Sequence, residues 1–279
     1  MPELPEVETT LLAVKPLLTN KKIKAVKVYN GNLRWPVSKE ITKKLPLSVI
    51  NKCWRRGKYL IFEQEAGGCL LHLGMSGCLS IMPLGSLPKK HDHVVFILAE
   101  NQIHFNDPRR FGCVLWAAKP ILEHRLLARL GPEPLEQSFD AGVLFQATRL
   151  SKVVIKQWLM TAKNLVGVGN IYASEALFVA KISPFEIAKD LTLSDCEVLV
   201  FNIKKILNKS ISLGGTTLKD FYSPDAKAGY FKQELMVYGK AGKPCFICKT
   251  LLSLVQINKR STFYCQQCQK LSAPRVISR

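Results

Sequence analysis

Two pairs of cysteines near the end of the chain constrain its folding more than any other feature. Cys245 and Cys248 form one Cys-x2-Cys pair, and Cys265 and Cys268 form a second pair after 16 intervening residues. Each pair puts two thiolates on one tight turn, and two such turns at the base of a hairpin supply a tetrahedral set of four sulfur ligands for Zn²⁺. A module of this size is too small for its own core, so the metal would supply folding free energy. We therefore predict one structural zinc; two redox-active pairs are the alternative.

The other five cysteines occur singly, mostly in apolar surroundings, at positions 53, 69, 78, 113 and 196. This pattern is typical of reduced, buried thiols rather than of a disulfide framework. The first residues also lack the basic and apolar regions of a secretory signal. We expect a soluble protein of the cytoplasm.

The charge balance points to a polyanionic partner. Lys and Arg number 40 and Asp and Glu 21, which gives a formal net charge of +19. Such a field attracts nucleic acid, and an anionic membrane is the alternative. The sequence has no apolar run of 18 residues and no separate basic amphipathic helix, so we expect no membrane association.

The hydrophobic periodicity changes twice along the chain. Helical spacing over residues 5–19 is followed by short strand-like runs at 23–29, 59–63, 69–73, 94–98 and 114–116. Further helices are predicted at 121–130, 140–147, 152–161, 170–180 and 194–212, and residues 131–134 read as a linker. We predict an α+β protein with a β-rich domain at 1–130, a helical domain at 131–237 and a cysteine module at 238–279.

A glycine-rich turn in the helical part could bind phosphate. Residues 167–169 read Gly-Val-Gly and precede a predicted helix, whose free backbone N–H groups and positive dipole end attract anions. Asn170 could donate to phosphate or simply cap that helix. Lys152 and Lys156 on the preceding helix, with Lys163 after it, add positive charge to a segment that could grip a DNA backbone.

The second residue is a possible nucleophile. Pro2 follows the initiator methionine, and a small residue at this position normally permits removal of Met1. The resulting secondary amine would have a pKa near ~8, so a useful neutral fraction exists at physiological pH. Glu3 could supply or accept a proton. Without further context, this segment could equally be a plain entry to a helix.

Seven blocks, in order along the chain, resemble those of the formamidopyrimidine-DNA glycosylases of the Fpg/Nei family. The blocks are Pro2–Thr9, Arg56–Leu60, His72–Gly77, Asp107–Gly112, Gly167–Tyr172, Gly214–Phe221 and the two cysteine pairs. The resemblance implies an N-terminal β-sandwich domain, a helix-two-turn-helix domain and a β-hairpin zinc finger, in a monomer of the bacterial cytosol or nucleoid. The implied partner is double-stranded DNA that contains oxidised purines or abasic sites.

The resemblance also implies a bifunctional glycosylase and AP lyase of base excision repair, acting on 8-oxoguanine and formamidopyrimidines. Pro2 would attack C1′ and form a Schiff base, with Glu3 as the acid/base for opening of the sugar ring. Lys58 would be the proton donor for β-elimination, and Arg260 would assist δ-elimination.

The family's DNA contacts fall on seven residues of this chain. Met75, Arg109 and Phe111 would fill the space left by the everted base, as apolar wedges and a partner for the orphaned cytosine. His72, His91, Lys152 and Asn170 match positions that contact DNA. Met75 and Phe111 could instead be core residues, and His91 could belong to a structural cluster with Asp92 and His93.

Two segments depart from the family's pattern. The loop of residues 214–230 would close over the everted base, and it carries Ala226 and Ala228 where relatives often have glycine and proline. The hairpin of residues 257–260 reads Ile-Asn-Lys-Arg instead of the frequent Gly-Gly-Arg, so the arginine is kept in altered surroundings. Two alternatives remain: a sister glycosylase for oxidised pyrimidines, which usually has Gly where this chain has Leu4, and a non-catalytic zinc-containing DNA-binding protein.

Overall fold

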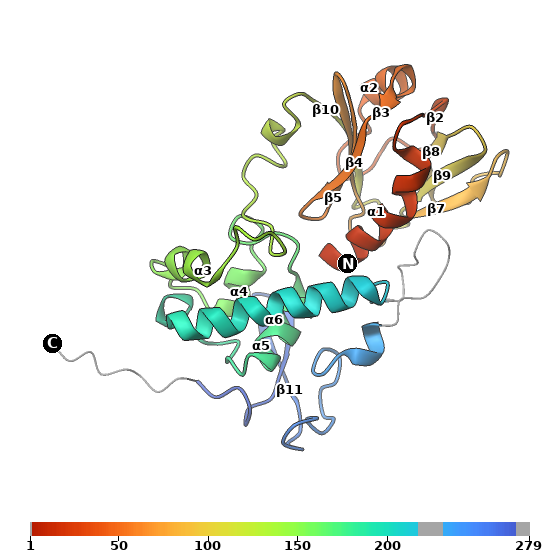
Figure 1. Ribbon diagram of the computed structural model, residues 1–279. Helices are drawn as coiled ribbons and strands as arrows, with labels where there is room; N and C mark the ends of the chain where they lie inside the picture. Colours follow the sequence, from red (N-terminus) through yellow and green to blue (C-terminus); the bar gives the residue numbers. More distant parts are fainter. Residues whose placement is uncertain (1, 217–230, 272–279) are drawn as a thin grey trace. The chain divides into compact units, whose positions relative to one another are not determined.

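The computed structural model describes residues 2–216 and 231–271 (Figure 1). The chain separates into two compact units, one formed by residues 1–129 and 210–232 and the other by residues 130–209 and 233–279. Within the described ranges, no helix is long and apolar enough to cross a membrane.

The first unit begins with helix α1, Leu4–Leu18, which places the start of the chain against a sheet. Its buried apolar face includes Leu4, Val7, Leu11 and Val14. The helix packs against strands of both sheets described below. The predicted helix over residues 5–19 is therefore present.

Two four-stranded antiparallel sheets form the body of this unit. One sheet has the order β10-β6-β5-β4, and the other has the order β2-β8-β9-β7. The strands of the first sheet are Cys113–Ala118, Gly67–His72, Tyr59–Gln64 and Lys52–Arg56, in that order. Those of the second are Ala25–Val28, Asp92–Ile97, Asn101–Asn106 and Cys78–Pro83. Smaller elements are β1 (Lys21–Lys22), β3 (Val49–Ile50), α2 (Lys39–Lys44), η1 (Leu45–Leu47) and η2 (Ile121–Glu123).

The two sheets share one hydrophobic core. Phe62 of β5 and Phe96 of β8 meet edge to face, with ring centroids 6.2 Å apart. Residues from both sheets and from α1 belong to the same buried cluster, and Figure 1 shows the labelled strands of the two sheets beside each other. The two sheets thus form a β-sandwich, and the predicted α+β class is confirmed.

The second unit combines helices with a two-stranded hairpin. Its elements include α3 (Ala141–Thr148), α4 (Ile155–Leu159), α5 (Asn170–Val179), η3 (Ala188–Asp190), β11 (Ser253–Ile257) and β12 (Arg260–Tyr264). The unit boundaries fall within α6 (Leu193–Ser212) and η4 (Phe231–Glu234). Two turns separate α4 from α5, as expected for a helix-two-turn-helix arrangement.

Two predicted helices differ from the structure. The helix expected over residues 121–130 is wrong: only Ile121–Glu123 is helical, and turns closed by the carbonyl of His124 follow it. Those turns bury Leu127 without a helix, so the apolar spacing was misleading. Helix α4 begins at Ile155 rather than at 152, because Val154 is extended and pairs with Ile187 as an isolated bridge.

A buried lysine joins the helices of the second unit to the hairpin. Lys156 is only 1% exposed, and its ammonium donates to Asn170 Oδ1, to the Ser261 carbonyl and to Thr262 Oγ1 at 2.7–3.0 Å. Three acceptors match the three N–H donors of an ammonium group. Lys156, expected from the sequence to add charge to a DNA-gripping surface, therefore points inward.

Candidate functional site

The N-terminal end of α1 is a buried carboxylate arrangement. Glu3 is the N-cap of the helix and forms a capping box with Glu6, in which the Glu3 N–H donates to Glu6 Oε2 at 2.9 Å. The other oxygen of Glu6 accepts from the N–H and the hydroxyl of Thr216, at 2.9 and 2.7 Å. Pro2 and Glu3 are themselves buried. The candidate nucleophile is thus held at the positive end of a helix dipole, beside two carboxylates.

Lys58 lies in the turn between β4 and β5. Arg56 pairs with Tyr59, which leaves Gly57 and Lys58 as a two-residue hairpin turn. Gly57 has a φ of +58°, the left-handed conformation that glycine adopts without strain. A short turn on a paired sheet restricts where the Lys58 backbone can lie.

His72 connects the Lys58 hairpin to the next loop. Its ring lies 4.7 Å from that of Tyr59, its cross-strand neighbour. His72 Nδ1 accepts the Gly74 N–H at 2.9 Å, so the proton of the neutral ring is on Nε2. Burial, with the nearby Lys58 and Arg34 charges, lowers the pKa of His72 to about 4. The ring is therefore neutral near pH 7.

The Met75 and Arg109 loops pack against each other. Ser76 Oγ donates to Asp107 Oδ1 at 2.8 Å, while the Gly112 N–H donates to Asp107 Oδ2 at the same distance. Gly74 has a φ of +67°, and a Cβ there would lie 2.5 Å from the Gly112 nitrogen. The close approach of the two loops therefore requires glycine at position 74.

The three candidate wedge residues come from these loops. Phe111 is 42% exposed, which is unusual for a large aromatic side chain. The Arg109 guanidinium lies over its ring, 4.9 Å from the centroid. Met75 is half-buried. The structure thus brings an exposed aromatic ring and a cation together on one loop, next to the loop that carries Met75, and the core alternative does not fit Phe111.

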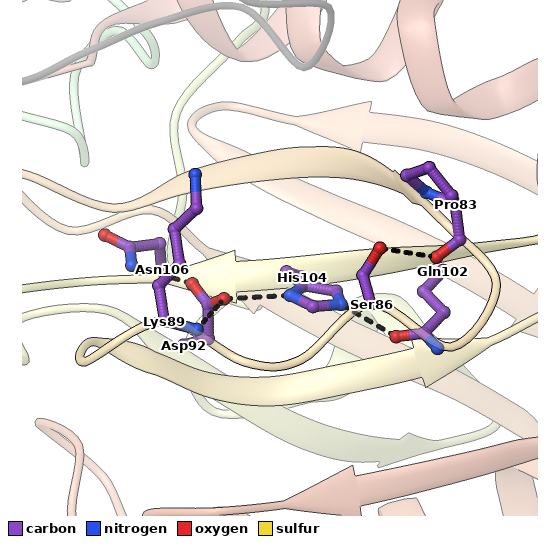
Figure 2. A network of polar contacts seen from close by, with 7 residues as sticks. All are labelled: Pro83, Ser86, Lys89, Asp92, Gln102, His104 and Asn106. Carbon is purple, nitrogen blue, oxygen red and sulfur yellow. Dashed lines mark hydrogen bonds and ion pairs between the residues drawn. The ribbon is translucent and has the colours of Figure 1, made fainter.

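His91 lies between a polar network and the Arg109 loop. Figure 2 shows this network, with His104 between Asp92 and Gln102. The Asp92 carboxylate accepts from His104 Nδ1, Asn106 Nδ2 and the Lys89 N–H. Burial alone would raise the pKa of Asp92, but these hydrogen bonds outweigh it and lower the pKa. The half-buried His91 accepts the Asp107 N–H through its carbonyl.

His93 completes this link. Its Nε2 donates to the Asp107 carbonyl at 2.8 Å, so both polar groups of the Asp107 backbone are held by residues 91–93. The structural cluster considered for His91 is therefore present around Asp92 and His93. A DNA contact by the His91 side chain stays a prediction.

In the second unit, Asn170 and Arg260 are brought close by the hairpin. Asn170 is the first residue of α5 and Gly169 is its N-cap, so the interpretation of Asn170 as a cap is wrong. Its amide donates to the Ser261 carbonyl at 2.9 Å, next to Arg260. Arg260 and Lys152 are both exposed.

The hairpin tip keeps its turn despite the altered sequence. Asn258 and Lys259 have φ values of +47° and +59°, as a two-residue type I′ turn requires. Asparagine accepts this conformation readily, and lysine adopts it at some cost. The turn thus forms without the glycines that relatives often have.

The four module cysteines converge. Their sulfur atoms all lie within 4.8 Å of one another, with Cys245 Sγ 3.9 Å from Cys268 Sγ and Cys248 Sγ 3.4 Å from Cys265 Sγ. Zn–S bonds of ~2.3 Å in a tetrahedron place sulfurs about 3.8 Å apart. The donor set fits zinc in both number and spacing. The single cysteines 53, 69, 78, 113 and 196 are free, and all but the half-buried Cys78 are buried.

Sequence reasoning missed three residues that organise the site. The first is Glu6, whose signal in the sequence is the Glu-x-x-Glu spacing of a capping box with Glu3. Asp107 and Glu175 carry no such local signal, since Asp107 reaches back to Ser76 in another loop and Glu175 binds residues more than 60 positions away. Glu175 accepts the N–H groups of residues 236–238 at 2.8–3.0 Å. The predicted lesion loop with Ala226 and Ala228 lies outside the described residues from 217 onward.

We predict that replacement of His72 by Gln flattens the pH dependence of stability. The pKa of His72 is below its ordinary value, so the unfolded chain binds more protons between pH 6.5 and about 4. This contribution to stability is complete above pH 6.5 and is lost as the pH falls toward 4, by about 3 kcal/mol. Urea midpoints at pH 7.5 and 4.5 should fall less for the variant; an equal fall in both proteins would contradict this.

We predict that Cys265→Ser abolishes stoichiometric zinc binding and unfolds the cysteine module. The loss of one thiolate from four leaves an incomplete ligand set for the metal. Zinc content by elemental analysis is the readout. Cys78→Ser is the control and should retain one zinc per chain, because Cys78 lies outside the cluster. Full zinc content in Cys265→Ser would refute the site.

Family models match the chain in three consecutive segments. The descriptions are "Formamidopyrimidine-DNA glycosylase N-terminal domain" for residues 1–114, "Formamidopyrimidine-DNA glycosylase H2TH domain" for residues 130–222 and "Zinc finger found in FPG and IleRS" for residues 242–271. Together with the sulfur geometry, the third match confirms the predicted single structural zinc, held by cysteines 245, 248, 265 and 268.

Curated proteins and solved structures that are similar to this chain agree with the family models. The chain is 49% identical over 271 residues to a formamidopyrimidine-DNA glycosylase of Shigella dysenteriae, covering 97% of this chain and 100% of the relative. A solved structure of MutM (Fpg) from Thermus thermophilus matches with a TM-score of 0.87 and 33% identity, covering 98% of this chain and 100% of that one. A complex of Lactococcus lactis Fpg with abasic-site DNA matches with a TM-score of 0.88 and 32% identity, covering 96% and 99%. The chain therefore belongs to the formamidopyrimidine-DNA glycosylase family and is a DNA glycosylase of base excision repair.

Proposed function

We propose that this enzyme excises oxidised purines, 8-oxoguanine and formamidopyrimidines, from double-stranded DNA and then cuts the strand at the resulting abasic site. The observation that carries the proposal is the placement of Pro2 at the head of α1, next to Glu3 and the buried carboxylate of Glu6. Removal of Met1 is part of the proposal, since only then is the Pro2 nitrogen a free amine.

In the first chemical step, the Pro2 nitrogen attacks C1′ of the damaged nucleotide. The lone pair of the neutral amine forms the new N–C bond, and the glycosidic bond breaks with its electrons going to the leaving base. The positive end of the α1 dipole disfavours a protonated amine at this place. Glu3 transfers the proton that opens the sugar ring, which leaves an iminium between Pro2 and C1′.

The strand is cut in the next two steps. The iminium acidifies the C2′ protons, so loss of one of them expels the 3′ phosphate by β-elimination, and δ-elimination then expels the 5′ phosphate. Lys58 is the proposed proton donor in β-elimination, and its place in a two-residue turn of the same unit as Pro2 supports this role. Arg260 is proposed to assist δ-elimination, and its exposed position at the start of β12 supports a phosphate contact.

The same proposal covers recognition of the duplex. Met75, Arg109 and Phe111 would fill the gap left by the everted nucleotide, and the exposure of Phe111 supports an insertion role. The other proposed DNA contacts come from His72, His91, Lys152 and Asn170. Because His72 is neutral, it would act as an Nε2–H donor rather than as a cation.

The proposed arrangement has three domains, at 1–130, 131–237 and 238–279. We expect the enzyme to act as a monomer in the bacterial cytoplasm. The similar curated proteins come from bacteria, which supports the bacterial setting. Relatives of known structure support the substrate class, because a mutant of Lactococcus lactis Fpg has been solved with Fapy-dG DNA and Lactococcus lactis Fpg has been solved with abasic-site DNA.

A preference for oxidised pyrimidines is the second candidate. The observation that favours it is a structure of Lactococcus lactis Fpg with DNA that contains an oxidised pyrimidine. Against it stands Leu4, which is fully buried at the first turn of α1 where pyrimidine-type relatives usually have glycine. The two candidates share the chemistry of Pro2 and differ only in the lesion.

We predict that borohydride traps the unmodified enzyme covalently on DNA that contains 8-oxoguanine or an abasic site. Reduction converts the iminium into a stable amine, so a band of protein joined to DNA appears on a denaturing gel. Pro2→Gly should lose most of this adduct, because glycine supplies a less nucleophilic primary amine and lacks the fixed ring. The absence of any adduct with unmodified enzyme would favour a non-catalytic DNA-binding protein.

We also predict faster excision of 8-oxoguanine opposite cytosine than of thymine glycol. The measurement is the single-turnover rate of base release from two duplexes that differ only in the lesion. Faster release of thymine glycol would replace the purine assignment by the pyrimidine one and would leave the proline chemistry intact.

A further inference from the structure

We propose that Arg55, anchored by Glu8, is a positioning residue that fixes the orientation of Lys58. The inference rests on the proposed role of Lys58 in strand cleavage. It is carried by two contacts of one guanidinium: Arg55 Nε lies 2.7 Å from Glu8 Oε2, and Arg55 Nη1 donates to the Gly57 carbonyl at 2.9 Å.

The Gly57 carbonyl belongs to the peptide unit that joins Gly57 to Lys58. Gly57 has a positive φ, whereas Lys58 keeps a negative one. A positive φ at only the first central position is the pattern of a type II′ turn, and positive values at both positions are the pattern of type I′. The two turns differ by a rotation of the central peptide plane. In this hairpin, that rotation would turn the Lys58 backbone and redirect its side chain.

Arg55 opposes this rotation by holding the carbonyl oxygen of that peptide. A hydrogen bond from a charged donor is stronger than one between neutral groups. This bond would be lost if the carbonyl turned away. The left-handed conformation that Lys58 would then adopt is also unfavourable for a residue with a Cβ. The guanidinium therefore selects one turn conformer and, with it, the direction in which the Lys58 side chain leaves the backbone.

Glu8 holds the guanidinium in place from helix α1. The Arg55 side chain is 9% exposed and that of Glu8 is 23% exposed, so solvent screens the pair much less than it screens a surface ion pair. Helix α1 also carries Pro2 and Glu3 at its N-terminal end. Through Glu8 and Arg55, the Lys58 turn is thus tied to the helix that positions the candidate nucleophile.

The geometry of the two contacts favours arginine over lysine at position 55. Its planar fork presents separate N–H groups to two acceptors at once, one on a helix and one on a turn. A lysine has a compact ammonium on a flexible stem and would satisfy the Glu8 charge more readily than both directions together. Arg55→Lys should therefore give an intermediate effect.

The test measures two steps separately on duplex DNA that contains an abasic site. Borohydride trapping reports the Schiff base, and the single-turnover rate of strand cleavage reports elimination. In Arg55→Gln we expect cleavage to slow by about ten- to a hundredfold, while trapping is retained or increased. Arg55→Gln added to Lys58→Gln should cause no further slowing, because Arg55 acts through Lys58.

Two further variants separate positioning from folding. Glu8→Gln keeps a hydrogen-bond acceptor and should slow cleavage in the same direction to a smaller extent, and its urea unfolding curve shows that the variant is folded under the assay conditions. Lys119→Gln removes another ion pair of the same unit, Lys119 Nζ to Glu63 Oε1 at 3.5 Å, and should leave cleavage at the normal rate.

Two outcomes would overturn the inference: normal cleavage in Arg55→Gln, or the same fold slowing by Arg55→Gln with and without Lys58. Two other results would instead show that the proposed function is wrong. If the unmodified enzyme forms no adduct, the proposed Pro2 chemistry is wrong. If Lys58→Gln cleaves normally, the proposed role of Lys58 is wrong. In either case the positioning role of Arg55 falls with it.

Discussion

A single buried carboxylate, that of Glu6, holds together the part of the molecule on which the proposed chemistry depends. One oxygen accepts the backbone N–H of Glu3 and so fixes the first turn of α1. The other accepts two donors from Thr216, 210 residues further along the chain. A Cβ on Gly215 would lie 3.2 Å from that oxygen, so glycine permits the close approach. Loss of this carboxylate would leave several buried donors unsatisfied at the position of the candidate nucleophile.

Two other buried carboxylates hold loops in the same way. Asp107 joins the two loops that carry Met75, Arg109 and Phe111, through contacts with Ser76 and Gly112. In the second unit, Glu175 gathers three consecutive N–H groups ahead of the cysteine module, and burial raises its pKa despite those hydrogen bonds. Buried carboxylates of this kind need complete hydrogen bonding to be tolerated, so each one strongly favours a single loop conformation.

Local patterns in the sequence predicted the local structure. The cysteine spacing led to a four-sulfur cluster, and the apolar periodicity of residues 5–19 led to α1. Contacts between distant residues were beyond such patterns: the sequence does not show that Lys156 turns inward to Ser261 and Thr262, or that Arg55 reaches both Glu8 and Gly57. The helix expected at 121–130 failed for a related reason, since tertiary packing buries Leu127 through turns.

In the candidate site, the sequence likewise predicts which residue types are present but not how they are arranged. Its residue types could be read from motifs, while the tautomer of His72 and the exposure of Phe111 required the fold.

The central claim is that the Pro2 nitrogen becomes covalently joined to deoxyribose. Peptide mapping by mass spectrometry of the borohydride-reduced complex tests it most directly. The account predicts a sugar remnant on an N-terminal peptide that begins at Pro2; a remnant on Lys58, or Met1 still attached in the reacted protein, would contradict it.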